Sequence, residues 1–456
     1  MKIQNPATGG VIATVATDNA KAVHAKYDRA RAAQPRWAAR SMAKRLAAIR
    51  EFRAQVVART DLLARTLSEE VGKPLRQSRN ELSALTGRLD FFLAESARAL
   101  RDERVFASAE QKLEERITHE PLGVIANISA WNYPYFVGSN VFVPALVAGN
   151  AVLYKPSEFA TLTGLHIAEM MQASGVPEDV FIPVVGDGAT GAAVLRMPVD
   201  GVFFTGSYGT GAKIAASAGQ RMIKAQLELG GKDSIYVTDD VDVKAAAVAV
   251  ADGAFYNTGQ SCCSVERIYV HESVHDDFVD AFLAEVKGFK LGDPLDEATY
   301  IGAITRKPQL AVLKRQVGDA VKKGAKLRLG GDVLRRKGNW FAPTVLTDVD
   351  HSMAVMRDES FGPIIGIQAV ADDDAAIDLM NDSEYGLTAG VYVRNEKRGR
   401  RILSRVNAGT VYWNCCDRVS PRLPWSGVKH SGIGLTLSTY GIQTFTRPKA
   451  WHLKSA

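Results

Sequence analysis

The sequence contains little cysteine and lacks any long hydrophobic run. Its 456 residues include only four cysteines, in two adjacent pairs, Cys262–Cys263 and Cys415–Cys416. Four thiols are too few for a disulfide framework, and none shows the Cys-x-x-Cys or Cys/His spacing of a zinc site. The longest apolar stretch, 141–154, contains Pro144 and Asn150 and is shorter than the roughly 20 residues that cross a bilayer. We therefore expect no structural disulfide, no metal and no membrane partner.

A strong excess of one charge is also absent. The chain carries 56 Lys and Arg against 50 Asp and Glu, a formal net charge of +6. Nucleic-acid binding needs clustered positive charge. The densest basic stretches, 314–328 and 397–405, contain no interleaved aromatic residues and indicate solvated helix faces. The first residues, MKIQNPATGG, lack the apolar core of a signal peptide. These features predict a cytoplasmic protein without a nucleic-acid partner.

Short apolar strands alternate with helices through the middle of the chain. Residues 21–98 have a helical composition with a break at Gly72 and Pro74. Strands are then predicted at 123–128, 151–154, 180–185, 201–205 and 222–229, separated by helices at 141–149, 161–174, 191–197 and 209–219. A second region, 232–427, has a predicted helix at 243–256 and strands at 267–271, 364–369, 389–393 and 409–413. This alternation is typical of α/β folds with a parallel, doubly wound sheet.

Cys262 ends the segment Tyr-Asn-Thr-Gly-Gln-Ser-Cys, between the predicted helix at 243–256 and the strand that follows it. A glycine turn that presents a thiol at the junction of two elements favours a nucleophile. The alternative is an inert buried thiol, because free cysteine is among the most buried residue types.

Two further motifs place polar side chains at predicted strand ends. Glu228 precedes two glycines and fits a general base in a cleft, although a surface salt bridge would also suit it. Asn132, in Trp-Asn-Tyr-Pro, could donate its amide to an oxyanion or could cap the next helix.

Two more motifs suit parts of a nucleotide. Gly206 and Ser207 begin a Gly-rich helix whose free N–H groups could bind a phosphate, or they form only a tight turn. Lys155 and Glu158 could hold a ribose, or they could belong to a capped helix start at Ser157.

The five motifs occur together as Trp-Asn-x-Pro, Lys-Pro-Ser-Glu, Phe-Thr-Gly-Ser-x-x-x-Gly, Glu-Leu-Gly-Gly-Lys and Gly-Gln-x-Cys, in that order. This arrangement resembles the NAD(P)-dependent aldehyde dehydrogenase superfamily, and the intervals from Glu228 to Cys262 and on to Glu359 match as well. The resemblance covers nearly the whole chain. It implies an α/β aldehyde dehydrogenase-like fold with a Rossmann-type cofactor domain (1–102 and 122–230), an α/β catalytic domain (231–427) and a small β oligomerisation element (103–121 and 428–456).

The resemblance also implies the chemistry. Cys262 would be the nucleophile, Asn132 the oxyanion-hole amide and Glu228 the base that activates the deacylating water. The aldehyde would pass through a cysteine thiohemiacetal and a thioester to a carboxylic acid. The implied cofactor is NAD, with NADP possible, because the Glu158 carboxylate would repel a 2′-phosphate. The implied cofactor contacts are Ile128, Ser129, Trp131, Lys155, Ser157, Glu158, Gly206, Ser207, Leu229, Gly230, Glu359 and Phe361.

The implied substrate is a small aldehyde, and the resemblance places Val137, Asn140, Tyr256, Ser261, Asp417, Val419 and Trp425 along its tunnel. Arg418 and Arg422 could bind the distal carboxylate of a semialdehyde, whereas Asp417 would favour a cationic or hydroxylated substrate. The residues therefore leave the substrate open, between a semialdehyde and a small aliphatic or aromatic aldehyde.

This sequence departs from the family at two positions often assigned to proton relay. Val141 stands where many members carry Lys, and Thr436 stands where many carry Glu. A CoA-acylating enzyme and a non-catalytic protein on the same fold are alternatives. The presence of Glu228 argues against the first, and the joint presence of Cys262, Glu228 and Asn132 argues against the second. The resemblance implies a homodimer or homotetramer, because the family's tail pairs with a neighbouring subunit's sheet. The strand-like tail of this chain is consistent with that, since an exposed edge strand favours pairing.

Overall fold

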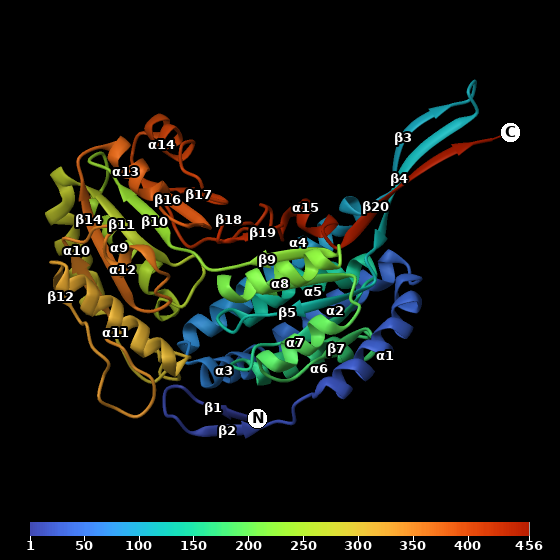
Figure 1. The fold of residues 1–456 in the computed structure, drawn as a ribbon, viewed down its shortest axis with the longest axis horizontal. Helices are drawn as coiled ribbons and strands as arrows, with labels where there is room; N and C mark the ends of the chain where they lie inside the picture. Colours follow the sequence, from blue (N-terminus) through green and yellow to red (C-terminus); the bar gives the residue numbers. More distant parts are fainter. Residues whose placement is uncertain (456) are drawn as a thin grey trace.

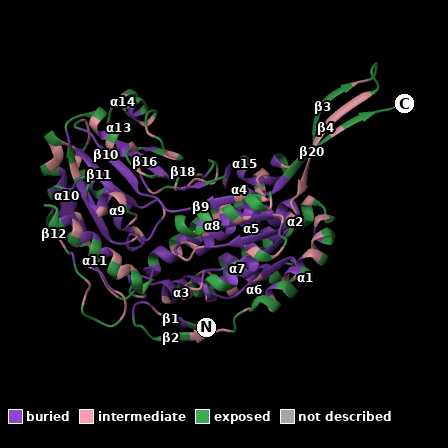
Figure 2. Ribbon diagram, viewed as in Figure 1, coloured by how far each residue is buried: buried purple, intermediate pink, exposed green. Residues whose placement is uncertain are grey.

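The computed structural model describes residues 1–455 and contains two large sheets side by side, with a narrow three-stranded arm extending from one of them (Figure 1). Buried residues are concentrated in the two sheets and in the helix faces that cover them, as the purple elements in Figure 2 show. The chain carries its functional motifs on the edges of these sheets that face each other.

The first sheet has the strand order β19-β9-β8-β5-β6-β7, with β5 to β9 parallel. From β5 the chain adds β6 and β7 on one side and then returns to add β8 and β9 on the other. This is the doubly wound order, and it creates a crevice beyond the carboxyl ends of β5 and β8, where the winding direction changes. This strand order confirms the predicted fold class, an α/β fold with a doubly wound parallel sheet. The strands are β5 Val124–Ile128, β6 Ala151–Lys155, β7 Phe181–Pro183, β8 Gly201–Thr205, β9 Lys224–Glu228 and β19 Gly432–Ile433.

Helices cover both faces of the first sheet, which explains why every residue of β5 and β6 is buried. The helices between its strands are α5 Pro134–Ala148, α6 Thr161–Ala173, α7 Gly188–Arg196 and α8 Tyr208–Gln220. Four further helices, α1 Ala20–Ala38, α2 Met42–Ala58, α3 Thr60–Val71 and α4 Leu75–Ala99, follow an N-terminal hairpin of β1 Lys2–Gln4 and β2 Val11–Thr14. The predicted break is confirmed: α3 ends at Val71, the Gly72 that follows has a φ of 80° that suits glycine, and Pro74 precedes α4.

The second sheet has the order β12-β13-β14-β11-β10-β16-β17 and is parallel except at β12. Its strands are β10 Asp233–Val237, β11 Val265–His271, β12 Lys326–Leu329, β13 Thr344–Thr347, β14 Ile364–Val370, β16 Thr388–Tyr392 and β17 Thr410–Trp413. Its helices are α9 Val243–Phe255, α10 His275–Gly288, α11 Lys307–Lys322, α12 Ala354–Arg357, α13 Asp373–Asn381 and α14 Glu396–Leu403. Two 3-10 turns, η1 Tyr256–Gly259 and η2 Glu272–Val274, flank β11.

The arm is an antiparallel sheet of order β20-β4-β3 that projects away from the body (Figure 1). It consists of β3 Glu103–Ser108, β4 Leu113–Pro121 and the C-terminal β20 Thr446–Lys454. A separate two-stranded sheet joins β15 Tyr385–Gly386 to β18 Val428–Lys429. After β18 the chain passes through β19 and α15 Ser438–Gln443 and then forms β20. Although β19 lies in the segment assigned to the oligomerisation element, it pairs with β9 of the first sheet.

Several expected element boundaries are wrong for local reasons. The strand expected from residue 222 begins at Lys224, because Met222 has a φ of 54° and is 93% exposed. The helix expected at 141–149 begins earlier, at Pro134, where proline suits the first turn. The basic stretch 314–328 is not one helix face: α11 ends at Lys322 and residues 326–329 form β12.

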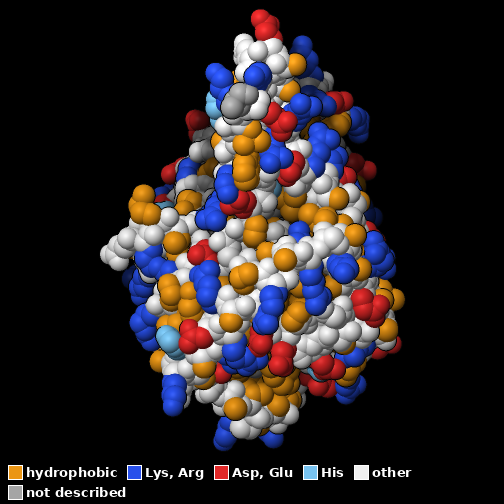
Figure 3. Space-filling view, turned by 90° about the vertical axis from the view of Figure 1, so that its right-hand side faces the viewer, with side chains coloured by type: hydrophobic (Ala, Val, Ile, Leu, Met, Phe, Trp, Pro, Cys, Tyr) orange, Lys and Arg blue, Asp and Glu red, His pale blue; other side chains and the backbone are white. Residues whose placement is uncertain are grey.

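No helix among residues 1–455 is both long enough and apolar enough to cross a membrane. Positive and negative side chains are interspersed on the face seen in Figure 3, where the arm is at the top. That mixture agrees with the small net charge of the sequence.

Candidate active site

Two cavities meet at Cys262, between the two large sheets. The larger cavity has a volume of about 430 Å³ and is lined mainly by α4, α5 and the loop 417–425. The smaller has a volume of about 200 Å³ and lies at the carboxyl ends of β5 and β8. Only Cys262 lines both cavities, among the residues that line either one. Its thiol is therefore placed between a pocket for one molecule and a crevice for another.

The chain reaches Cys262 through an unusual turn. Asn257 and Thr258 have φ values of 52° and 58°, and Gly259 follows at 68°. A Cβ at Gly259 would collide with the carbonyl oxygen of Gly362, so this position requires glycine. The turn is fixed by its neighbours, since the Asn257 N–H donates to Gln77 Oε1 at 2.9 Å. Consecutive left-handed residues cost energy and persist where surrounding structure over-determines them, which is common at functional sites.

Glu228 lies next to the thiol. The Cys262 Sγ donates to Glu228 Oε1 at 3.4 Å, and the Trp425 Nε1–H donates to the same oxygen at 2.7 Å. Thr205 Oγ1 donates to the other carboxylate oxygen at 3.4 Å. Glu228 is only 4% exposed, so it is not a surface salt-bridge carboxylate. The structure thus places a buried carboxylate within proton-transfer reach of the thiol and fixes its orientation through an indole N–H.

Glu228 and Cys262 both lose their protons less readily in this environment than in water. Burial raises the pKa of Glu228, although hydrogen bonds from Trp425 and Cys262 oppose this shift. A hydrogen bond from Cys263 lowers the pKa of Cys262, but burial and the charges of Glu228 and Asp233 outweigh it and raise that pKa to about 11. The free enzyme therefore holds Cys262 mainly as a thiol, and Glu228 is the neighbouring group that can accept its proton.

Alkylation of Cys262 by iodoacetamide is expected to accelerate as the pH rises. The thiolate is the reacting species, and a pKa raised to about 11 means that its fraction still increases above pH 9. Mass spectrometry of the Cys262 peptide after timed alkylation measures the rate at each pH. A rate that levels off below pH 8 would contradict the raised pKa.

Asn132 lies just before α5 and does not cap it. The residue that precedes the helix is Tyr133, and no side chain makes a capping hydrogen bond there. Asn132 is 3% exposed, lines the smaller cavity with Cys262, and is anchored by a hydrogen bond of 3.3 Å from Asn257 Nδ2 to its carbonyl oxygen. Its side-chain amide therefore remains available to the cavity, as an oxyanion donor requires.

The smaller cavity combines a helix N-terminus, a buried carboxylate and two aromatic rings. Ser207 precedes α8 and makes no side-chain cap, which leaves the first N–H groups of that helix free for a phosphate. Glu359 accepts from the Gly231 N–H at 3.2 Å, and burial raises its pKa to about 8. Phe361 meets Trp131 edge to face, with ring centroids 5.5 Å apart. Of the predicted cofactor residues, Trp131, Gly206, Ser207, Gly230, Glu359 and Phe361 line this cavity.

The other predicted cofactor residues lie outside this cavity, at strand ends of the first sheet. Lys155 ends β6, is 3% exposed, and its Nζ lies 3.9 Å from Glu158 Oε2. Ser157 Oγ donates to Glu158 at 3.4 Å. The Ser129 N–H donates to the Lys155 carbonyl oxygen, which joins the ends of β5 and β6. Ile128 and Leu229, the remaining two, are buried in the core of the first sheet.

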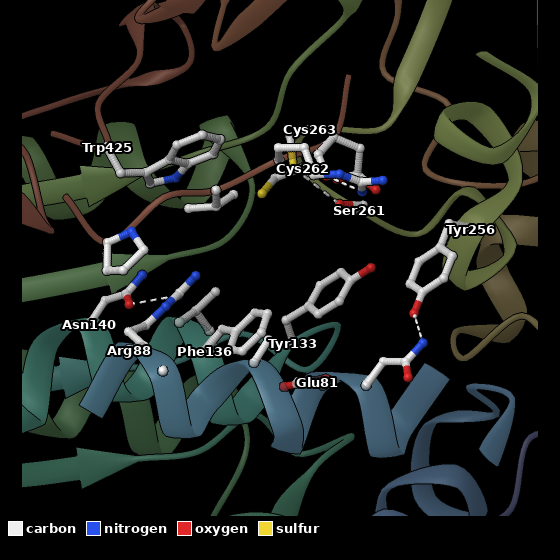
Figure 4. A pocket seen from close by; sticks show the side chains of 18 of the residues that line it. Glu81, Arg88, Tyr133, Phe136, Asn140, Tyr256, Ser261, Cys262, Cys263 and Trp425 are labelled. Carbon is white, nitrogen blue, oxygen red and sulfur yellow. Dashed lines mark hydrogen bonds between the residues drawn. The ribbon is translucent and has the colours of Figure 1, made fainter. Parts of the chain in front are cut away.

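All seven predicted tunnel residues line the larger cavity: Val137, Asn140, Tyr256, Ser261, Asp417, Val419 and Trp425. Figure 4 shows Cys262 and Trp425 on one side of this pocket and Tyr133, Phe136, Asn140 and Arg88 on the other. The predicted anion binders Arg418 and Arg422 line it as well but are exposed.

Sequence reasoning missed the wall that α4 contributes. Gln77, Glu81 and Arg88 all line the pocket and all are buried. Glu81 forms a buried ion pair with Lys73, whose Nζ lies 3.6 Å from the centre of the Tyr133 ring. The available signal was the helical spacing of polar residues on a face that also carries Leu82, Leu85 and Leu89.

Val141 and Thr436, the two positions that depart from the family, carry buried side chains that do not replace the Lys and Glu of other members. Val141 is 1% exposed in α5. Thr436 is also 1% exposed, and its Oγ1 has no hydrogen-bond partner among residues 1–455. Its backbone instead pairs with that of Trp425, which holds the indole over Glu228.

Comparison with known proteins agrees with this geometry. The profile of the aldehyde dehydrogenase family matches residues 1–451. A chloroplastic betaine aldehyde dehydrogenase of Amaranthus hypochondriacus is 33% identical, and the match covers 98% of this chain and 91% of that protein. An NAD-dependent aldehyde dehydrogenase from Sinorhizobium meliloti superposes with a TM-score of 0.96 at 32% identity, covering 99% and 91% of the two chains. Lactaldehyde dehydrogenase from Escherichia coli gives a TM-score of 0.96 at 30% identity, covering 100% and 96%.

The chain therefore belongs to the aldehyde dehydrogenase family, whose members use NAD or NADP.

Proposed function

We propose that the protein oxidises a small aldehyde to a carboxylic acid with NAD, using Cys262 as nucleophile and water as the acyl acceptor. The observation that carries this proposal is the Cys262–Glu228 contact of 3.4 Å at the junction of the two cavities. A nucleophile with a base beside it, between a substrate pocket and a cofactor crevice, is the arrangement that covalent aldehyde oxidation needs.

In the first half-reaction Cys262 loses its proton to Glu228, and the thiolate sulfur forms a bond to the aldehyde carbon. The carbonyl oxygen becomes an oxyanion, which the Asn132 amide stabilises by a hydrogen bond. A nicotinamide held in the crevice that Trp131, Glu359 and Phe361 line would supply the oxidant, because it would accept a hydride from that carbon. The loss of hydride restores the carbonyl group and leaves a thioester on Cys262.

Between the two half-reactions Glu228 releases the Cys262 proton to solvent. In the second half-reaction the Glu228 carboxylate takes a proton from water, and the water oxygen attacks the thioester carbon. The carbon–sulfur bond breaks, the acid leaves, and the thiol is regenerated. The Trp425 N–H, 2.7 Å from Oε1, holds the carboxylate in place and opposes the rise of the Glu228 pKa. Burial therefore makes Glu228 a stronger base than a carboxylate in water, and the hydrogen bond limits that increase.

NAD is proposed over NADP because Glu158 lies beside Lys155 at the end of β6, where a 2′-phosphate would meet its carboxylate. Members of the family use NAD or NADP, so this choice depends on the local charge.

A homodimer or homotetramer in the cytoplasm is proposed as the working form. The arm supports oligomerisation, because β20 and β3 are open edges and Val105, Phe106 and Leu453 on them are 61%, 42% and 40% exposed. The four cysteines are free thiols, which suits a reducing compartment.

The proposed function predicts NADH formation from short aldehydes at a rate that does not depend on CoA. Absorbance of NADH is followed with butanal, benzaldehyde, lactaldehyde, betaine aldehyde and succinate semialdehyde, each with and without CoA and with NADP in parallel. The acid is identified by chromatography. A requirement for CoA, with an acyl-CoA as product, would favour the acylating alternative. No turnover with any aldehyde would favour a non-catalytic protein on this fold.

A further inference from the structure

Arg88 is a buried cation in the wall of the substrate pocket that faces Trp425. It lies on α4, is 4% exposed, and lines the cavity of about 430 Å³ together with Glu228, Cys262 and Trp425. Figure 4 shows its side chain beside Asn140 and Phe136, reaching toward the space below Cys262. The catalytic steps described above do not use it.

The protein gives this guanidinium only neutral partners. Its Nη1 donates to Asn140 Oδ1 at 2.8 Å, and its Cζ lies 4.1 Å from the centre of the Phe136 ring. Within residues 1–455 no carboxylate forms an ion pair with Arg88, and its Nε and Nη2 donate no hydrogen bond. Both nitrogens therefore keep some accessible surface, because neither belongs to the fully buried polar atoms without a hydrogen-bond partner. These two donors therefore open into the pocket, on the side of the guanidinium that could bind a carboxylate with two parallel hydrogen bonds.

An unpaired buried guanidinium is costly, and the pKa reflects this cost. Burial lowers the pKa of Arg88 to about 10, even though the negative charges of Glu228 and Glu81 favour its charged form. Lys73 on the same wall is also fully buried, but it is paired with Glu81. A buried charge usually has a partner of opposite charge. For Arg88 that partner has to enter the pocket from outside.

The remaining charges of the pocket point to the same occupant. Asp417 accepts a hydrogen bond from Cys263 at 2.9 Å, and burial raises its pKa to about 7, so it is a weak anion. The charges of Arg418 and Lys73 oppose this rise. Arg418 and Arg422 are exposed. A substrate ammonium or amino group placed beside Arg88 would be repelled by its like charge. An anionic group could instead accept hydrogen bonds from the buried guanidinium.

We propose that Arg88 binds the distal carboxylate of a short aldehyde acid whose aldehyde carbon is at Cys262. This inference rests on the proposed function, because it names the substrate class of the same pocket. The apolar middle of such a substrate would pack against Phe136 and Trp425, which both line the cavity. Arg88 is thus a specificity-determining residue, and the exposed Arg418 and Arg422 are not required for recognition.

The test compares charged and neutral aldehydes of equal length. Wild-type protein, Arg88→Met and Arg88→Lys are assayed with succinate semialdehyde and with butanal, and kcat/KM is measured for each. Methionine keeps the apolar stem of arginine, and lysine keeps the charge but not the planar guanidinium with its parallel N–H donors. Loss of charge-assisted hydrogen bonds predicts that Arg88→Met lowers the ratio of the two kcat/KM values by about 10- to 150-fold. Arg422→Met, the matched control at an exposed arginine of the same pocket, should change the ratio less than threefold.

The ratio separates recognition from other roles of Arg88. Its charge also acts on Cys262 and Glu228, so its loss could slow oxidation of every aldehyde. An equal fall for butanal and succinate semialdehyde would overturn the proposal, and so would a wild-type enzyme that shows no preference for the acid. If Arg88→Met does not fold, as thermal melting would reveal, Arg88→Lys and the wild-type preference still decide the question.

A binding measurement separates this proposal from the proposed function. Calorimetry with succinate, which carries a carboxylate at each end and needs no turnover, is performed on the wild type and on Arg88→Met. Weaker binding to the variant supports the carboxylate site even if no aldehyde is oxidised, which would refute only the proposed function. Equal binding to both proteins, with butanal oxidised normally, would refute only the role of Arg88.

Discussion

Replacing Cys262 by alanine is expected to reduce aldehyde oxidation by about 10⁴-fold or more, because the covalent intermediate can no longer form. The change removes one small side chain at the junction of two cavities, so the fold and the cofactor crevice should survive. NAD binding, followed by quenching of protein fluorescence, should remain within a few-fold of the wild type. The measurement is NADH formation at saturating aldehyde, beside the binding titration.

Cys415→Ala is the matched control for this experiment. Cys415 is also a partly exposed free thiol, but it follows β17 and lines neither cavity. This variant should keep the wild-type rate. Residual dehydrogenase turnover in Cys262→Ala above about one part in 10² of the wild type would refute Cys262 as the nucleophile.

Replacing Glu228 by glutamine is expected to slow deacylation by about 10²–10⁴-fold, the usual contribution of a general base. Glutamine preserves shape and can still accept the Trp425 N–H through its amide oxygen, but it cannot take a proton from water. Because Glu228 also takes the Cys262 proton in the first half-reaction, NADH should appear in a slowed burst of close to one equivalent per active site, followed by a still slower steady rate. Rapid mixing with NAD and aldehyde measures both phases.

Trp425→Phe provides a graded comparison. Phenylalanine keeps an aromatic wall but removes the hydrogen bond of 2.7 Å to Oε1. Because that bond opposes the rise of the Glu228 pKa, its loss should raise the pKa further and shift the rising limb of the steady-state pH profile to higher pH.

If Glu228→Gln loses the burst while its steady rate is unchanged, the carboxylate serves Cys262 activation and not deacylation.

Local sequence was sufficient to identify the strand ends that carry the chemistry. Trp131 and Asn132 follow β5, Gly206 follows β8, and Glu228 ends β9, as expected from apolar runs that stop at polar or glycine residues. The carboxyl ends of parallel strands share one edge of a sheet, so short motifs far apart in the chain converge without any knowledge of side-chain packing. The seven tunnel residues came from the family resemblance alone. All seven line the larger cavity, but the wall that α4 contributes was not foreseen.

Other features could not be found in this way. The hairpin β1–β2 and the strands β10, β12 and β13 were missed, because short strands with mixed composition carry little periodicity. Helix α5 was placed too late in the chain, since its first turn contains Tyr135 and Phe136 in place of the small residues found farther along.

The sequence by itself indicated the family through five short motifs in a fixed order, and the doubly wound sheet through alternating apolar strands and helices. Three of those motifs also supplied the residues proposed for catalysis. Only the tertiary structure decided that the Trp425 indole would hold Glu228, 197 positions away, and that Arg88 would face the same pocket without an ionic partner. The physical reason is that charge recognition depends on which groups are left unpaired after folding. That balance is set by burial and by contacts between distant elements, which no local pattern records.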